Sequence, residues 1–163
     1  MREWIPVPGT TKGRLVEAAL AEFARRGYDA VGVTEIAAAA GVTVGSLYHH
    51  FGSKPGLYDL VRDDVERRVL DRMEGAWDAA PDLARAVGVG FDYLVRAGYE
   101  RLLAEPHPGR DSDPVEGFLA AHADREGMPL GRLLAATWRA ALTASLDDPD
   151  AARRALATIV PSA

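Results

Sequence analysis

Apolar residues recur along the chain at intervals of three and four, the spacing that places side chains on one face of an α-helix. The clearest stripe repeats every four residues and consists of Leu57, Val61, Val65, Val69, Met73 and Trp77. Alternating runs of β-branched and aromatic residues, which would predict strands, are scarce. The pattern predicts an all-α fold, with helices over residues 11–26, 33–40, 44–51, about 53–77, about 81–105, 115–125, 129–146 and 148–160.

Three glycines divide the N-terminal part into short helices. Gly27 and Gly52 follow the first and third helices, and Gly41 opens a compact turn between the second and the third. Thr43 is suited to cap the third helix. This layout is typical of a helix-turn-helix domain, which we expect over residues 1–54. The next helix, about 25 residues long, exceeds what such a unit needs and begins a second helical domain over residues 55–163.

Residues 106–114 contain three prolines and a glycine among polar side chains. Such a composition is typical of a loop rather than a helix. We expect this segment to be mobile.

Composition excludes several classes of protein. The 163 residues are 48% hydrophobic and 26% charged, as in ordinary globular proteins. The absence of cysteine rules out disulfide scaffolds, thiolate metal sites and cysteine nucleophiles. No apolar run approaches the roughly 20 residues that cross a bilayer, and the start of the chain lacks the layout of a secretion signal. We expect a cytoplasmic protein without a membrane partner.

The net charge of −5 is unevenly distributed. Residues 1–60 hold six basic and six acidic residues, so the whole excess of negative charge lies in the remainder. Phosphate neutralisation needs local positive charge. A neutral first part predicts only modest affinity for DNA of arbitrary sequence.

Residues 31–57 read VGVTEIAAAAGVTVGSLYHHFGSKPGL. This stretch resembles the DNA-binding signature of the TetR (tetracycline-repressor-like) family, in which an Ile-Ala pair, an Ala-Gly-Val turn, a Gly-x-Leu-Tyr-x-His-Phe helix and a Ser-Lys pair follow at fixed spacing. The resemblance covers residues 10–77 firmly and the rest by general helical layout. It implies a transcriptional regulator, more specifically a repressor that binds a palindromic double-stranded DNA operator as a homodimer and is released by a small apolar or amphipathic ligand.

Helical geometry gives the third helix two faces. Leu47 and Phe51 lie four residues apart and should pack in the small core, while Tyr48 and His49 project to the opposite side. In a helix-turn-helix the second helix of the motif enters the major groove with its N-terminal residues against base edges. Together with the resemblance, this geometry implies base contacts from Val44, Gly45, Ser46 and His49. The resemblance implies phosphate contacts from Thr34, Thr43, Tyr48, His50 and Lys54.

Two departures from the family pattern affect this interpretation. Gly32 stands where the family usually has a threonine or serine that caps the second helix. The recognition helix also has no Arg, Asn or Gln at its start, so specificity should depend on DNA shape and on few contacts.

The second domain is expected to enclose an apolar ligand pocket with a few polar groups. The candidate lining residues are Trp77, Phe91, Leu94, Phe118, His122 and Trp138, with Met128, Tyr93 and Tyr99 as further members of the same interior. Each of them is equally compatible with plain core packing. Binding there would shift the population between two dimer geometries. The sequence names neither the effector nor the target genes.

The last two helices resemble the pair that builds the family's dimer. The candidate interface residues are Leu130, Leu133, Leu134, Trp138, Leu142 and Leu156. A twofold operator requires two reading heads roughly one DNA turn apart, which favours a dimer. The same stripe could instead lie within one chain. Because the second domain is short for the family, the sequence does not decide whether it contains a ligand pocket.

Alternative functions are poorly supported. No zinc-protease, phosphate-loop or nucleophile-elbow motif occurs, so we expect neither an enzyme nor a cofactor. His49 and His50 point about 100° apart on a helix and lack a third ligand, so no metal site is expected. The remaining alternative is a DNA-binding or partner-binding helical dimer that has no small-molecule ligand.

Overall fold

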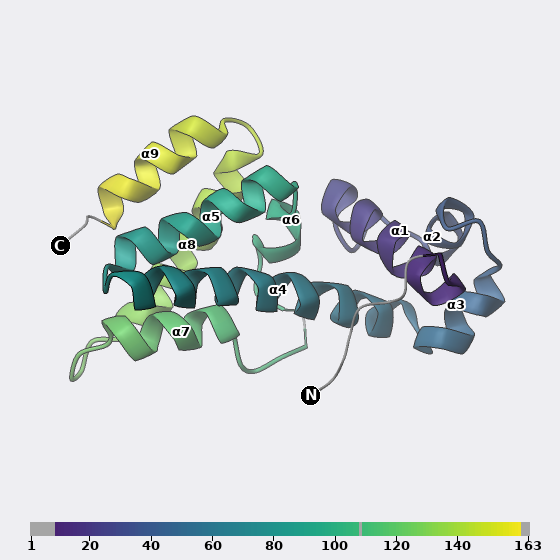
Figure 1. Cartoon of the computed structure of the whole chain (residues 1–163), viewed down its shortest axis with the longest axis horizontal. Helices are drawn as coiled ribbons and strands as arrows, with labels where there is room; N and C mark the ends of the chain where they lie inside the picture. The colour runs from purple at the N-terminus through teal and green to yellow at the C-terminus, as the bar shows by residue number, and fades with distance from the viewer. Residues whose placement is uncertain (1–8, 108, 161–163) are drawn as a thin grey trace. The chain divides into compact units, whose positions relative to one another are not determined.

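The computed structural model describes residues 9–107 and 109–160, which form helices without strands (Figure 1). The first residues, used above to argue against a secretion signal, lie outside the described part. The helices are α1 (Thr11–Arg26), α2 (Val33–Ala39), α3 (Val44–Phe51), α4 (Lys54–Ala79), α5 (Leu83–Ala97), α6 (Glu100–Leu103), α7 (Pro114–Ala123), α8 (Leu130–Ser145) and α9 (Pro149–Ile159). The all-α prediction is confirmed.

The chain divides into two compact units, Met1–Asp64 and Val65–Ala163. This division falls inside α4, whereas the sequence-based domain limit at residues 54 and 55 coincides with the start of that helix. The limit at the start of α4 stays a prediction. None of the described helices is both long and apolar enough to cross a membrane.

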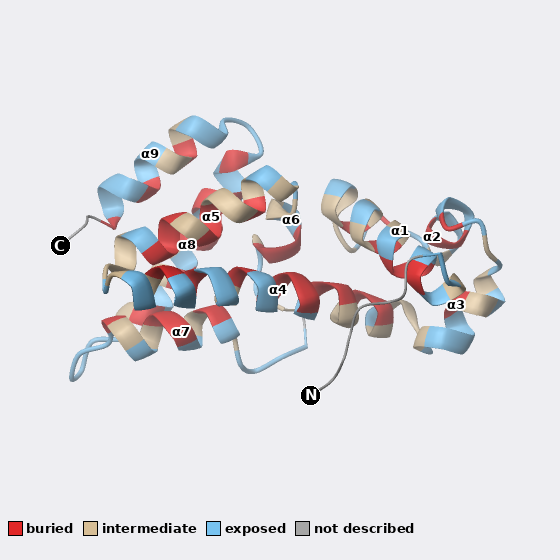
Figure 2. Ribbon diagram, viewed as in Figure 1, coloured by how far each residue is buried: buried red, intermediate tan, exposed pale blue. Residues whose placement is uncertain are grey.

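The N-terminal unit packs three short helices around a small core. Leu15 and Phe23 of α1, Ile36 of α2 and Leu47 of α3 are fully buried, and the buried residues of α1 gather on one side of the helix (Figure 2). Phe23 also meets the ring of Tyr58 edge-on, with 5.1 Å between ring centroids. These contacts fix how α3 is held.

The predicted inward position of Phe51 is only partly right. Its side chain is half-buried, whereas Leu47 one turn earlier is fully buried. Phe51 is the last residue of α3 and precedes Gly52, whose φ of 73° ends the helix. The chain therefore turns away from the core at this residue.

The C-terminal unit is built around α8. Trp138 is fully buried, and its indole N–H donates a hydrogen bond to the carbonyl of Val87 in α5 at 3.2 Å. Near the start of α8, Gly131 lies against the backbone of Ala120 in α7. Its amide also donates to the carboxylate of Asp124 at 2.6 Å. A side chain at Gly131 would hold α7 and α8 apart, so this glycine permits their close approach.

The predicted helix over residues 81–105 is wrong in its second half. α5 ends at Gly98, which adopts a left-handed conformation with φ 71°, and the short α6 follows. Leu102 of α6 is buried nonetheless. The spacing of apolar residues continues past Gly98 because α5 and α6 both contribute side chains to the same core. The next predicted helix also ends earlier, at Ala123, where Asp124 turns into an extended conformation.

The segment before α7 is attached to α8 by one arginine. The buried guanidinium of Arg139 donates to the carbonyls of Leu103 and Glu105 and to the carboxylate of Asp113. The other carboxylate oxygen of Asp113 accepts from the amide of Val115 at 2.9 Å and so caps α7. Both ends of the expected loop are thus fixed, and its mobility stays a prediction.

Candidate nucleic-acid interface and ligand groove

A tight turn sets the direction of α3. Gly41 has a φ of 64°, and the amide of Val42 donates to the carbonyl of Ala37 at 3.0 Å. The hydroxyl of Thr43 then accepts from the amide of Ser46 at 3.2 Å and caps α3. Because a capped N-terminus leaves few exposed amides without a partner, the first turn of α3 is held in a defined position.

The two faces of α3 differ sharply in exposure. Leu47 is fully buried, whereas Tyr48 is 48% exposed and His49 and His50 are exposed. Of the other candidate DNA contacts, Thr34, Thr43 and Gly45 are exposed, and Val44, Ser46 and Lys54 are half-buried. The candidates thus lie at the start of α2, in the turn between α2 and α3, on the outer side of α3 and at the first residue of α4.

His49 and His50 lie next to each other at the end of α3, with ring centroids 5.2 Å apart. Within the described ranges, no three His, Cys, Asp or Glu side chains are grouped in a way that could hold a metal ion. The two imidazoles therefore offer hydrogen-bonding groups at a helix end.

Lys54 contacts an aromatic ring of its own unit. Its Nζ lies 4.2 Å from the ring centroid of Tyr28, a cation–π distance. Burial, followed by the nearby carboxylate of Asp29, raises the pKa of Tyr28 above its ordinary value. The ring therefore stays neutral near pH 7, and Lys54 is held at the N-terminus of α4.

A polar network at the start of α2 escaped the sequence interpretation. The carboxylate of Glu35 accepts from the amide of Gly32 at 2.7 Å and from the guanidinium of Arg26 at 2.5 Å. The hydrogen bond from Arg26 and then that from Gly32 lower the pKa of Glu35, while Glu35 raises the pKa of Arg26. A glutamate three residues after a cap position is the signal that could have revealed the network. Glu35 thus forms one half of a capping box, and Gly32 has no side chain to form the other half.

A groove in the C-terminal unit brings together three of the predicted ligand-binding residues. The ring of His122 stacks on Trp77 at 4.1 Å between centroids and meets Phe118 edge-on at 4.7 Å. These three residues line a cavity of about 570 Å³ between α4 and α7. Glu74 and Asp78 line it too and were missed, although their spacing of four around Trp77 places them on one face of a helix.

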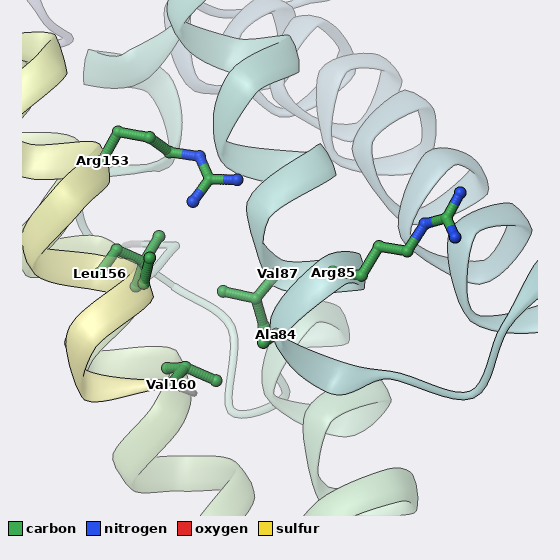
Figure 3. Close-up of a pocket in the computed structure, with 7 residues that line it drawn as sticks. Ala84, Arg85, Val87, Arg153, Leu156 and Val160 are labelled. Carbon is green, nitrogen blue, oxygen red and sulfur yellow. The ribbon is translucent and has the colours of Figure 1, made fainter. Parts of the chain in front are cut away.

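The other predicted pocket residues do not line this groove. Phe91, Leu94 and Trp138 are 0–1% exposed and belong to the core of the unit. A separate, smaller pocket of about 190 Å³ lies between α5 and α9. Figure 3 shows Leu156 of α9 facing Val87 of α5, while Arg85 points away from the gap.

The candidate interface residues fall into two groups. Trp138, Leu142 and Leu156 are buried within the chain itself. Leu130 and Leu134 are half-buried, and Leu133 is 61% exposed. The exposed surface of α8 and α9 also carries apolar residues that were not predicted, namely Ala136, Ala140, Ala155 and Ile159.

Comparison with known proteins agrees with this geometry. Residues 15–61 match the model of the bacterial regulatory proteins of the tetR family. The HTH-type transcriptional repressor KstR2 of Mycobacterium tuberculosis is 52% identical over 48 residues, which cover 29% of this chain and 24% of that protein. The HTH-type transcriptional activator FasR of Mycolicibacterium smegmatis is 38% identical over 87 residues, covering 51% and 40%. The chain thus matches less than half the length of either relative.

A similar fold is found over nearly the whole chain in a crystal structure of a tetR family transcription regulator from Shewanella sp. PV-4. The TM-score is 0.67 at 19% identity, and the alignment covers 93% of this chain and 96% of that one. At this identity the likeness concerns the fold alone.

An N-terminal helix-turn-helix unit is followed by an all-helical unit, and transcriptional regulators of known structure share this arrangement. Residues 15–61 of the chain are those of a TetR family DNA-binding domain, as the resemblance of residues 31–57 predicted. The two relatives are transcriptional regulators rather than enzymes, in agreement with the prediction from the sequence.

Proposed function

We propose that this regulator is a repressor that binds a palindromic operator as a homodimer in the cytoplasm and leaves it when a small molecule binds the C-terminal unit. The outer face of α3 is the observation that carries the proposal. Tyr48 and His49 are exposed on it while Leu47 anchors the opposite face. A helix held in this way offers its polar side to the major groove.

The contacts proposed to DNA differ in what they read. Val44, Gly45, Ser46 and His49 lie at or near the start of α3 and are assigned to base edges. Thr34, Thr43, Tyr48, His50 and Lys54 are assigned to phosphates, which fix register without reading sequence. The start of α3 has no Arg, Asn or Gln, the side chains that form bidentate contacts with bases. We therefore assign part of the sequence specificity to recognition of DNA shape.

The exposed apolar surface of α8 and α9 supports the homodimer. Leu133 and Ile159 are each 61% exposed, which is high for large aliphatic side chains, and Ala136, Ala140 and Ala155 are exposed on the same two helices. A surface of this kind is suited to a self-complementary twofold contact. Leu130 and Leu134, half-buried on the same helix, are assigned to its edge, whereas Trp138, Leu142 and Leu156 support it from inside the chain.

Repression is favoured over activation by the relatives. The repressor KstR2 has the higher identity, although its match is confined to 48 residues. The groove lined by Trp77, Phe118 and His122 supports a response to a small molecule. The alternative, a dimer that binds DNA or a protein partner and senses nothing, would leave this groove unused.

Selection of bound sequences from a random DNA pool tests the proposal. We expect recovery of a palindrome whose half-sites are about one helical turn apart. On the selected DNA, Tyr48→Phe and Lys54→Ala should weaken binding to every sequence alike, while Ser46→Ala and His49→Ala should change the preference among sequences. No enriched sequence, or equal losses from all four variants, would refute the proposed division of roles.

The oligomeric state needs its own measurement. Light scattering after size exclusion should give twice the chain mass of 17.5 kDa, and Leu133→Asp should return the monomer. A monomeric wild-type protein would contradict the proposed dimer. A screen of small molecules by thermal shift then separates the sensing regulator from the alternative, because a ligand of the folded state raises the melting temperature.

A further inference from the structure

The groove between α4 and α7 has aromatic walls on two sides. Trp77 comes from α4, and Phe118 and His122 come from α7. Phe118 is 8% exposed, so it forms a firm apolar wall, while Trp77 and His122 are half-buried and reach the opening. A volume of about 570 Å³ lies within the range of about 300–1,000 Å³ that small-molecule sites occupy.

Trp77 already carries a planar ring on its face. The imidazole of His122 lies 4.1 Å from the Trp77 centroid at an interplanar angle of 30°. A contact of this kind is a stacking arrangement. The groove is therefore adapted to flat rings, and a flat ligand would extend or replace this stack.

The charged residues that line the groove are all acidic. Glu74 and Asp78 lie one turn apart on α4, on either side of Trp77, and both are exposed. Neither Lys nor Arg is among the lining residues, and the ion pairs found in the described part of the chain use neither of these carboxylates. The groove mouth thus carries two carboxylates that form no ion pair within the described part of the chain.

We propose that this groove binds a planar aromatic cation, which is the small-molecule effector of the function proposed above. The π-face of Trp77 and the carboxylates of Glu74 and Asp78 attract the same positive charge, the first by cation–π interaction and the others by ion pairing. Phe118 and Leu70 contribute apolar contact. An anion of the same shape is repelled by both carboxylates.

The smaller pocket between α5 and α9 is less suited to a charged ligand. Arg153, which lines the space between α5 and α9, is paired with Asp92 at 2.8 Å between Nε and Oδ1. Its charge is therefore compensated within the chain. The groove between α4 and α7 has the two carboxylates described above and the larger volume.

Two xanthene dyes of similar size and opposite charge test the proposal on the full chain without DNA. Rhodamine 6G is a planar cation, and fluorescein is an anion at neutral pH. Fluorescence polarisation should give a Kd for rhodamine 6G at least about tenfold lower than that for fluorescein, a ratio equal to about 1.4 kcal/mol. The double variant Glu74→Gln with Asp78→Asn should lose most of this preference.

Asp71→Asn is the matched control, because Asp71 is exposed on α4 but does not line the groove. The control should bind rhodamine 6G as the wild type does. Equal binding of the two dyes, binding that is too weak to measure, or a double variant that behaves like the control would overturn the assignment. Trp77→Phe, which keeps an aromatic ring, should weaken binding less than Trp77→Leu.

DNA binding measured on the same proteins without dye separates this inference from the function it rests on. The double variant should bind selected operator DNA as the wild type does, because Glu74 and Asp78 lie outside the N-terminal unit. A wild type that binds operator but does not prefer the cation would refute the ligand class alone. A wild type that prefers the cation but selects no operator would refute the proposed function alone.

Discussion

The close contact between α7 and α8 predicts that an alanine substitution lowers the stability of the protein at Gly131 but raises it at Gly117. An alanine Cβ at Gly131 would meet the backbone nitrogen and Cα of Ala120 at distances that real Cβ atoms do not show. Backbone cannot move aside as a side chain can. Overpacking of this kind costs about 1–3 kcal/mol, and Gly131 sits in the first turn of α8, where the gain in helix propensity is small.

Gly117 of α7 provides the matched control. A Cβ at Gly117 would have no heavy atom within 4 Å. The substitution Gly117→Ala should therefore gain up to about 1 kcal/mol from helix propensity. The two variants should differ by about 1–4 kcal/mol, with opposite signs relative to the wild type.

Thermal unfolding followed by tryptophan fluorescence suits this comparison, since Trp77 and Trp138 both lie in the C-terminal unit. For a chain of this size, 1 kcal/mol shifts the melting temperature by about 2–4 °C. We expect a lower melting temperature for Gly131→Ala and a higher one for Gly117→Ala. If Gly131→Ala proved neutral or stabilising, the close packing of α7 on α8 would be refuted.

Further predictions concern the core, a buried ion pair and a helix cap. Leu47→Ala should destabilise the N-terminal unit by about 2–5 kcal/mol in urea unfolding, and a loss below 1 kcal/mol would contradict its central position. Arg139→Met should cost about 3–5 kcal/mol by leaving the carboxylate of Asp113 without its partner, and adding Asp113→Asn should restore part of the loss; no restoration would refute the ion pair. Because the pKa of Glu35 is lowered in the folded state, the wild type should be more stable than Glu35→Gln at neutral pH. This advantage should disappear as the pH falls below 4.5, and an advantage that grew in acid would contradict the cap at Gly32.

The exposure pattern of the candidate DNA-binding surface was predictable because its residues are neighbours in the sequence. The cap at Thr43, the buried Leu47 and the exposed Tyr48 follow from one helical period and one turn signal. The network at Glu35 was missed although its spacing was visible. Gly32 has no side chain to cap α2, so the usual cap signal is absent there, whereas the carboxylate that binds its amide lies three residues later.

The ligand groove could not be derived in this way. Trp77 and His122 are far apart in the sequence, and only the packing of α4 and α7 in the C-terminal unit brings their rings together. Phe91 and Leu94 are residues of the same apolar kind, yet they lie in the core. Residue type alone does not distinguish a groove wall from a core, since both are apolar. The break at Gly98 was hidden for a similar reason, because Leu102 continues the stripe beyond it.

The central claim is that the outer face of α3 lies against duplex DNA. Photo-crosslinking from position 48 tests it most directly, with Tyr48 replaced by p-benzoylphenylalanine, which keeps the aromatic ring of this exposed side chain. The same replacement at Met128 is the control, because this residue is 51% exposed and belongs to the C-terminal unit. We predict crosslinks to operator DNA from position 48 and none from position 128. Crosslinks from position 128 alone, or from neither position under conditions of full binding, would contradict the claim.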